Sequence, residues 1–136
     1  MELFLRILLG GVFCVAGAWK IDDPMLFESI IRNYRILGDP WIAWVAMFMP
    51  PFELIAGVCV ILRLLYPGCV IVLGGSLVFF MLALASLLIR GIDTECGCLG
   101  ITTTIQLQLL IDCGLCAVAC VLLCAWRNAE GRGAID

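Results

Sequence analysis

The 136-residue sequence contains no histidine, and charged residues make up only 14% of it. Without histidine the chain has no imidazole for acid–base catalysis, haem ligation or a mixed cysteine–histidine zinc site. The few charges sum to −3, and no basic tract offers a surface for a nucleic acid. These shortages argue against a soluble enzyme, a disordered chain and a nucleic-acid-binding protein.

Apolar residues are what the sequence has in excess. They make up 64% of the chain, and the mean hydropathy is +1.16. A chain of this size cannot bury so much apolar surface in its own interior. Four apolar windows lie at about residues 3–19, 41–62, 67–89 and 105–126. Each is long enough to cross a hydrocarbon layer of about 30 Å.

The fold class follows from this lipid environment. In lipid the backbone polar groups must bond within their own segment, so the spans are expected to be helices. Short links favour an antiparallel arrangement. We therefore predict an all-α integral membrane protein, a four-helix antiparallel bundle in one membrane domain over residues 1–136. The first window lacks a basic start and a small-residue cleavage motif, so we expect a retained helix rather than a signal peptide.

A shorter amphipathic segment separates the first two spans. Asp23 followed by Pro24 is a typical helix start, and apolar residues then recur at helical spacing as far as Leu37. Gly38 and Pro40 end the pattern. Residues 24–37 are too few to cross a membrane. They predict an amphipathic interfacial helix, either on the membrane surface or over the mouth of the bundle.

Positive charges are shared equally between the two ends of the predicted bundle. One end holds Arg6, Arg63, Arg127 and Arg132, and the other holds Lys20, Arg32, Arg35 and Arg90. The positive-inside count is therefore a tie, and the acidic excess of the second end adds a slight preference. We predict that both termini lie in the cytoplasm and that the links 20–40 and 90–104 lie outside. We expect a frayed tail after Trp126.

Cysteine is the abundant reactive residue, with nine copies. Cys96 and Cys98 flank a single glycine in the link before the fourth span. A disulfide between them would close a small strained ring, and strain makes a disulfide more exchangeable. On the outer side of the membrane the pair would face an oxidising compartment. We interpret it as a redox-active dithiol. A static disulfide and half of an all-cysteine metal site, which needs two further thiolates, are the alternatives.

The fourth span carries a second group of cysteines. Cys113, Cys116, Cys120 and Cys124 fall within about one quadrant of a helix. The spacing of Cys113 and Cys116 also matches the C-x-x-C pattern of thiol redox proteins. Two interpretations stay open: cysteine used as a small apolar packing residue, or a second redox pair that relays electrons from Cys96 and Cys98.

Four ionisable residues are expected at or near membrane depth, where charge is costly. Arg6 can anchor the first span by snorkelling or pair with Glu53, which lies near the middle of the second span. Asp112, in the outer part of the fourth span, can pair with Lys20 or manage a proton for Cys113, since exchange needs a thiolate. Structural roles and proton or redox roles both remain open for Glu53 and Asp112.

Several motifs resemble the MauE family, a branch of the DoxX-like four-helix membrane proteins. Arg90-Gly91 followed by Cys96-Gly97-Cys98-Leu99-Gly100 is similar to the family's R-G…C-G-C-F-G signature, with leucine in place of phenylalanine. Pro51, Glu53, Leu54 and Gly57 resemble its second helix, and Arg6, Gly10, Gly17 and Lys20 resemble its first. Asp112 stands where the family tends to have an acidic residue. The cysteines of the fourth span are not part of this pattern.

The resemblance implies a bacterial inner-membrane protein with the links 20–40 and 90–104 in the periplasm. It also implies a role in periplasmic disulfide formation beside a thioredoxin-like protein, during maturation of a cysteine-rich client. It carries Cys96 and Cys98 over as the redox pair, and Glu53, Lys20 and Arg6 as polar contacts of the bundle. A quinone is a possible electron acceptor, and no resident metal is expected. Two alternatives remain: a structural subunit of a larger membrane complex with a static disulfide, and a bundle that binds a soft metal or a sulfur species.

Overall fold

The computed structural model describes residues 1–91 and 104–133, and within them every regular element is a helix. The helices are α1 (Glu2–Asp22), α2 (Pro24–Asn33), α3 (Trp41–Leu62), α4 (Tyr66–Ile89) and α5 (Ile105–Gly133). Over this part of the chain, α1, α3, α4 and α5 are long and apolar enough to cross a membrane. The predicted all-α membrane bundle is confirmed. Cys96 and Cys98 lie outside the described residues.

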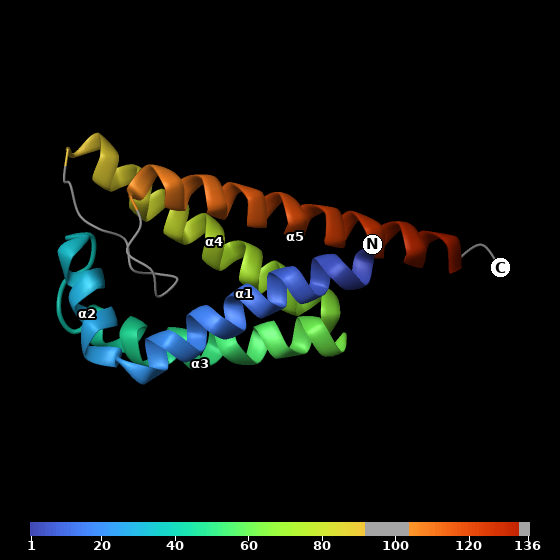
Figure 1. Ribbon diagram of the computed structural model, residues 1–136, viewed down its shortest axis with the longest axis horizontal. Coiled ribbons are helices and arrows are strands. Elements are labelled where there is room, and N and C mark those ends of the chain that lie inside the picture. The colour runs from blue at the N-terminus through green and yellow to red at the C-terminus, as the bar shows by residue number, and fades with distance from the viewer. Residues whose placement is uncertain (92–103, 134–136) are drawn as a thin grey trace.

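The four long helices alternate in direction along the chain (Figure 1). The start of α1 and the end of α5 lie at one end of the bundle, called here the terminal end. The short helix α2, the last turns of α4 and the first turns of α5 lie at the other end, called here the α2 end. The link between α4 and α5 therefore leaves α4 and enters α5 at the α2 end.

The last helix is longer than the sequence predicts. The expected frayed tail after Trp126 is wrong, because α5 continues to Gly133. Arg127, Ala129 and Glu130 are good helix formers, and one further turn of backbone hydrogen bonds costs little once a helix is established.

The helices α1 and α3 make the closest helix pair, and glycines allow it. A Cβ on Gly10 would lie 2.6 Å from the carbonyl oxygen of Gly57, and a Cβ on Gly57 would lie 2.8 Å from that of Gly10. About two helical turns further along α1, a Cβ on Gly17 would lie 2.9 Å from the carbonyl oxygen of Pro50. Small residues at such contacts let two backbones approach closely, which is the usual basis of helix packing in membranes. This packing sets which residues of α1 face which residues of α3.

The short helix α2 lies over the bundle. Its buried residues Phe27 and Ile31 join a core cluster with Tyr34 and with side chains of α3, α4 and α5. Asp23 caps the helix as predicted, because its Oδ1 accepts a hydrogen bond of 3.0 Å from the backbone nitrogen of Leu26. The apolar face of α2 is therefore covered by the bundle itself.

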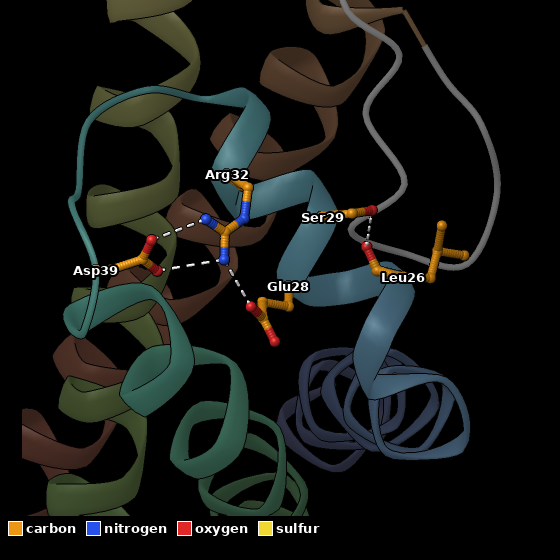
Figure 2. Close-up of polar contacts among 5 residues, drawn as sticks. All are labelled: Leu26, Glu28, Ser29, Arg32 and Asp39. Carbon is orange, nitrogen blue, oxygen red and sulfur yellow. Dashed lines mark hydrogen bonds and ion pairs between the residues drawn. The ribbon is translucent and has the colours of Figure 1, made fainter.

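Two arginines hold the segment after α2. The helix ends at Asn33, earlier than the predicted 37, because Arg35 takes a left-handed φ of 49°. Arg90, at the end of α4, donates hydrogen bonds of 3.3 and 3.2 Å to the carbonyls of Tyr34 and Arg35. Arg32 contacts both carboxylate oxygens of Asp39 and one of Glu28 (Figure 2). These hydrogen bonds, to Asp39 first, raise the pKa of the exposed Arg32 guanidinium, so it stays charged.

Candidate functional site in the bundle core

A buried ion pair joins α1 to α3. Lys20 is the last basic residue of α1, and its Nζ lies 2.7 Å from Oε2 of Glu53. The two residues are only 2% and 1% exposed. A lone charge at this depth would be strongly disfavoured, so each of the two groups depends on the other.

Two aromatic rings complete the surroundings of the ammonium group. Lys20 Nζ lies 5.0 Å from the ring centre of Phe27 in α2 and 4.9 Å from that of Phe80 in α4. At such distances the negative face of a ring attracts a cation, and the attraction is larger away from water. Lys20 therefore contacts side chains of α2, α3 and α4 at once.

A second polar pair projects from α5. Gln108 and Asp112 are four residues apart, hence on one face, and Nε2 of Gln108 donates a 2.9 Å hydrogen bond to Oδ1 of Asp112. Both residues are buried, at 2% and 4% exposure. Asp112 thus takes an amide of its own helix as hydrogen-bond donor, and the predicted ion pair of Asp112 with Lys20 is replaced by the pair of Lys20 with Glu53.

Both polar pairs face one small cavity among the four spans. Its volume available to water centres is about 30 Å³. Its lining comes from all four spans: Val12, Phe13, Ala16, Lys20, Glu53, Leu77, Phe80, Gln108, Asp112 and Leu115. The second carboxylate oxygen of Glu53, Oε1, is buried and has no hydrogen-bond partner among the described residues. The site is a polar centre in an otherwise apolar bundle.

Arg6 is far from this centre, and its predicted pairing with Glu53 is wrong. Fourteen residues separate Arg6 from Lys20, which is about 21 Å along a helix. The antiparallel packing of α1 on α3 therefore leaves Arg6 at the terminal end. There its Nε lies 3.9 Å from Glu2, and its guanidinium lies 5.9 Å from the ring centre of Tyr66.

Three of the four cysteines of α5 lie on the outside of the bundle, whereas Cys116 packs against an interior apolar cluster. Cys113, Cys120 and Cys124 are exposed on the outside of the bundle, and Cys116 is half-buried. Adjacent helical residues differ by about 100° in direction, so Asp112 lies inside while Cys113 lies outside. The structure therefore does not join Asp112 to Cys113, and it does not join the cysteines to Glu53.

The described residues include no group of three or more cysteine, aspartate or glutamate side chains spaced to hold a metal ion. A larger groove of about 490 Å³ opens where α1, α2 and α3 meet. Apolar side chains such as Met25, Met47 and Pro51 dominate its lining, with Lys20 and Glu28 as the charged residues. The groove has the size for a small lipid-soluble molecule, and quinone binding stays a prediction.

Sequence reasoning missed Gln108 and Arg90 as functional residues. Gln108 has a usable signal, because a polar residue one helical turn before Asp112 in an apolar span predicts a shared face. Arg90 belongs to the motif that carries the family resemblance, but its role as a donor to the segment after α2 depends on long-range packing. Phe27 and Phe80 as partners of Lys20 likewise depend on packing.

The fold and the site define a multi-pass helical membrane protein with a buried ammonium–carboxylate pair. Comparison with known proteins makes the class specific. The chain belongs to the MauE family, because the family model described as methylamine utilisation protein MauE matches residues 1–125.

One curated relative supports this membership. The chain is 30% identical over 95 residues to the methylamine utilization protein MauE of Paracoccus denitrificans. The alignment covers 69% of this chain and 51% of that protein, so the chain spans about half the length of the relative. No solved structure matches the chain. The resemblance of the sequence to MauE is confirmed, and the wider DoxX-like grouping stays a prediction.

Proposed function

We propose that the protein is a membrane thiol–disulfide redox protein that serves methylamine utilisation through Cys96 and Cys98. The observation that carries the proposal is this Cys-Gly-Cys pair in the link between α4 and α5 of a MauE-family chain. The partner would be a thioredoxin-like protein or a cysteine-rich client.

The proposed reaction is a two-step thiol–disulfide exchange. A client thiolate attacks one sulfur of the Cys96–Cys98 disulfide, which forms a mixed disulfide and releases the other cysteine as a thiolate. A second client thiolate then attacks the mixed disulfide and releases the first cysteine. The client loses two electrons, and the Cys96–Cys98 pair gains them. Reoxidation passes these electrons to an acceptor of the quinone class, and the chain returns to its starting state.

The neighbouring structure supports a fixed location for this chemistry. The helices α4 and α5, which flank the link, meet at the α2 end of the bundle (Figure 1). Arg90, the C-cap residue of α4, donates hydrogen bonds to the carbonyls of Tyr34 and Arg35. The start of the link is thereby tied to the segment after α2, which supports a partner-docking surface at this end.

Charge placement supports a periplasmic α2 end. The sequence has four positively charged residues at each end of the bundle when Lys20 is counted as a free charge. In the structure, however, Lys20 is buried and paired with Glu53. Removing it leaves Arg32, Arg35 and Arg90 at the α2 end against four arginines at the terminal end. The positive-inside rule then favours termini in the cytoplasm and the cysteine pair in the periplasm of an inner membrane.

The first test is the redox state of Cys96 and Cys98 in membranes. Differential alkylation and mass spectrometry over a series of glutathione potentials should give a reversible couple between about −120 and −270 mV, the range of exchange catalysts. The double variant Cys96→Ser/Cys98→Ser should lose client disulfide formation in cells. The matched control Cys113→Ser/Cys116→Ser should retain it, because those thiols lie in the membrane span.

Two results would reject the proposal. A pair that stays oxidised below about −300 mV is a static disulfide, and the protein is then a structural subunit. Normal client oxidation in the Cys96→Ser/Cys98→Ser strain, at equal protein level, would likewise exclude an exchange role.

A further inference from the structure

We propose that the bundle core is a proton-binding site, in which Asp112 holds one proton at neutral pH beside the ion pair of Lys20 and Glu53. The site is formed by Lys20 of α1, Glu53 of α3 and the Gln108–Asp112 pair of α5. The proposal does not depend on the thiol chemistry of Cys96 and Cys98.

The first argument is a count of charges in the core. Among the residues that the structure describes, the cavity is faced by one cation, Lys20, and by two carboxyl groups, Glu53 and Asp112. In this part of the chain α4 contributes Leu77 and Phe80, which do not titrate, and α2 adds the ring of Phe27 above Lys20. Two ionised carboxylates would leave an uncompensated negative charge at membrane depth. Burial disfavours such a charge, so one carboxyl group must carry a proton.

Geometry assigns the proton to Asp112. Glu53 Oε2 lies 2.7 Å from the ammonium nitrogen, and an adjacent opposite charge favours the ionised form. Asp112 accepts its hydrogen bond from the neutral amide of Gln108. A neutral donor stabilises a carboxylate less than an ammonium group does. Of the two groups, Asp112 therefore gains more from being neutral.

A second observation indicates that the site can hold a water molecule. Glu53 Oε1 is buried in a residue only 1% exposed and has no partner among the described residues. The cavity it lines has about 30 Å³ available to water centres, and a water molecule requires about 10–15 Å³. A water bound there would supply the hydrogen bond that Oε1 lacks, and the other polar lining residues would supply its remaining partners. Such a water also gives the proton a neighbour to exchange with.

Infrared spectroscopy of the full-length protein in lipid tests the charge count directly. A protonated carboxyl group has a carbonyl stretching band that a carboxylate lacks, and this band shifts in heavy water. The native protein should show one such band at neutral pH. Asp112→Asn should abolish it, and Glu53→Gln should abolish it too, because Asp112 then ionises to balance Lys20. Lys20→Met should raise its area about two-fold, because both carboxyl groups become neutral.

The unfolding temperatures of two variants distinguish the role of Asp112 from that of Glu53. Asp112→Asn replaces a neutral carboxyl by a neutral amide and should unfold at nearly the native temperature, whereas Glu53→Gln should unfold lower. The control Glu130→Gln changes an exposed carboxylate of α5 and should leave both readouts unchanged.

The proposal is overturned if the native protein shows no protonated carboxyl band at neutral pH. It is equally overturned if the band is unchanged in Lys20→Met, or if adding Na⁺ or K⁺ removes it. The last result would mean that a metal cation balances the second carboxylate. Because none of these readouts involves a disulfide, failure here is distinct from failure of the thiol-exchange proposal.

Discussion

At the scale of single residues, the decisive feature is the ion pair between Lys20 and Glu53. Both groups are almost fully buried, and the pair is one of the contacts between α1 and α3. In a low-dielectric interior each charge compensates the desolvation of the other. The loss of one partner leaves the other charge uncompensated, so it costs more than the loss of both. Arg6 differs from Lys20 in its position along α1. It lies near Glu2 at the terminal end, where long side chains can reach the interface.

A double-mutant cycle on this pair tests the argument. Lys20→Met or Glu53→Leu alone should each lower the unfolding free energy by up to about 3–5 kcal/mol, because the ion pair is lost and a buried carboxyl group must change its protonation to compensate the charge that remains. The double variant should be more stable than either single variant. Unfolding in detergent, followed by circular dichroism, measures all four proteins. Additive losses would show that the two side chains do not interact.

At the scale of elements, glycine contacts determine how α1 and α3 pack. Gly10 and Gly57 place the two backbones so close that neither position has room for a Cβ. Gly11, the next residue of α1, has no neighbouring atom within 4 Å of its Cβ position. The same helix thus contains one glycine that packing requires and one that it does not.

This contrast gives a pair of matched substitutions. Gly10→Ala should destabilise by about 1–3 kcal/mol, because its Cβ would lie 2.6 Å from the backbone oxygen of Gly57, which cannot move alone. Gly11→Ala should instead be neutral or stabilising by about 0.5–1 kcal/mol, because alanine favours a helix. Thermal unfolding in the same detergent compares them. Equal effects of the two substitutions would contradict the close packing of α1 on α3.

At the scale of the whole molecule, an even number of alternating spans puts both termini at one end (Figure 1). The α2 end carries the capping helix, the network of Arg32 with Asp39 and Glu28, and the attachment of the α4–α5 link. The polar centre lies at the level of Lys20, near this same end of α1. The two ends of the molecule are therefore chemically different.

Reporter fusions test the predicted orientation. Alkaline phosphatase, active only in the periplasm, should be inactive when fused after residue 136 and active when fused after Gly38. Green fluorescent protein, fluorescent in the cytoplasm, should give the reverse pattern. The charge balance of four arginines against three predicts this result, and the opposite pattern would place Cys96 and Cys98 in the cytoplasm.

The sequence by itself determined the membrane class, the four spans and the cap of α2 at Asp23. These depend on the local order of residues: long apolar windows, a carboxylate before Pro24, and few charges. It also identified Glu53, Asp112 and Lys20 as buried polar candidates, because ionisable residues stand out in an apolar span.

Only the tertiary structure decided which charges meet. Lys20 and Glu53 are separated by 33 positions in sequence, and their contact depends on the antiparallel packing of α1 on α3 at Gly10, Gly17 and Gly57. From the sequence alone, Arg6 was the expected partner of Glu53, and Lys20 was that of Asp112. The tertiary structure also decided that α2 lies on the bundle, because periodicity shows an apolar face but not what covers it.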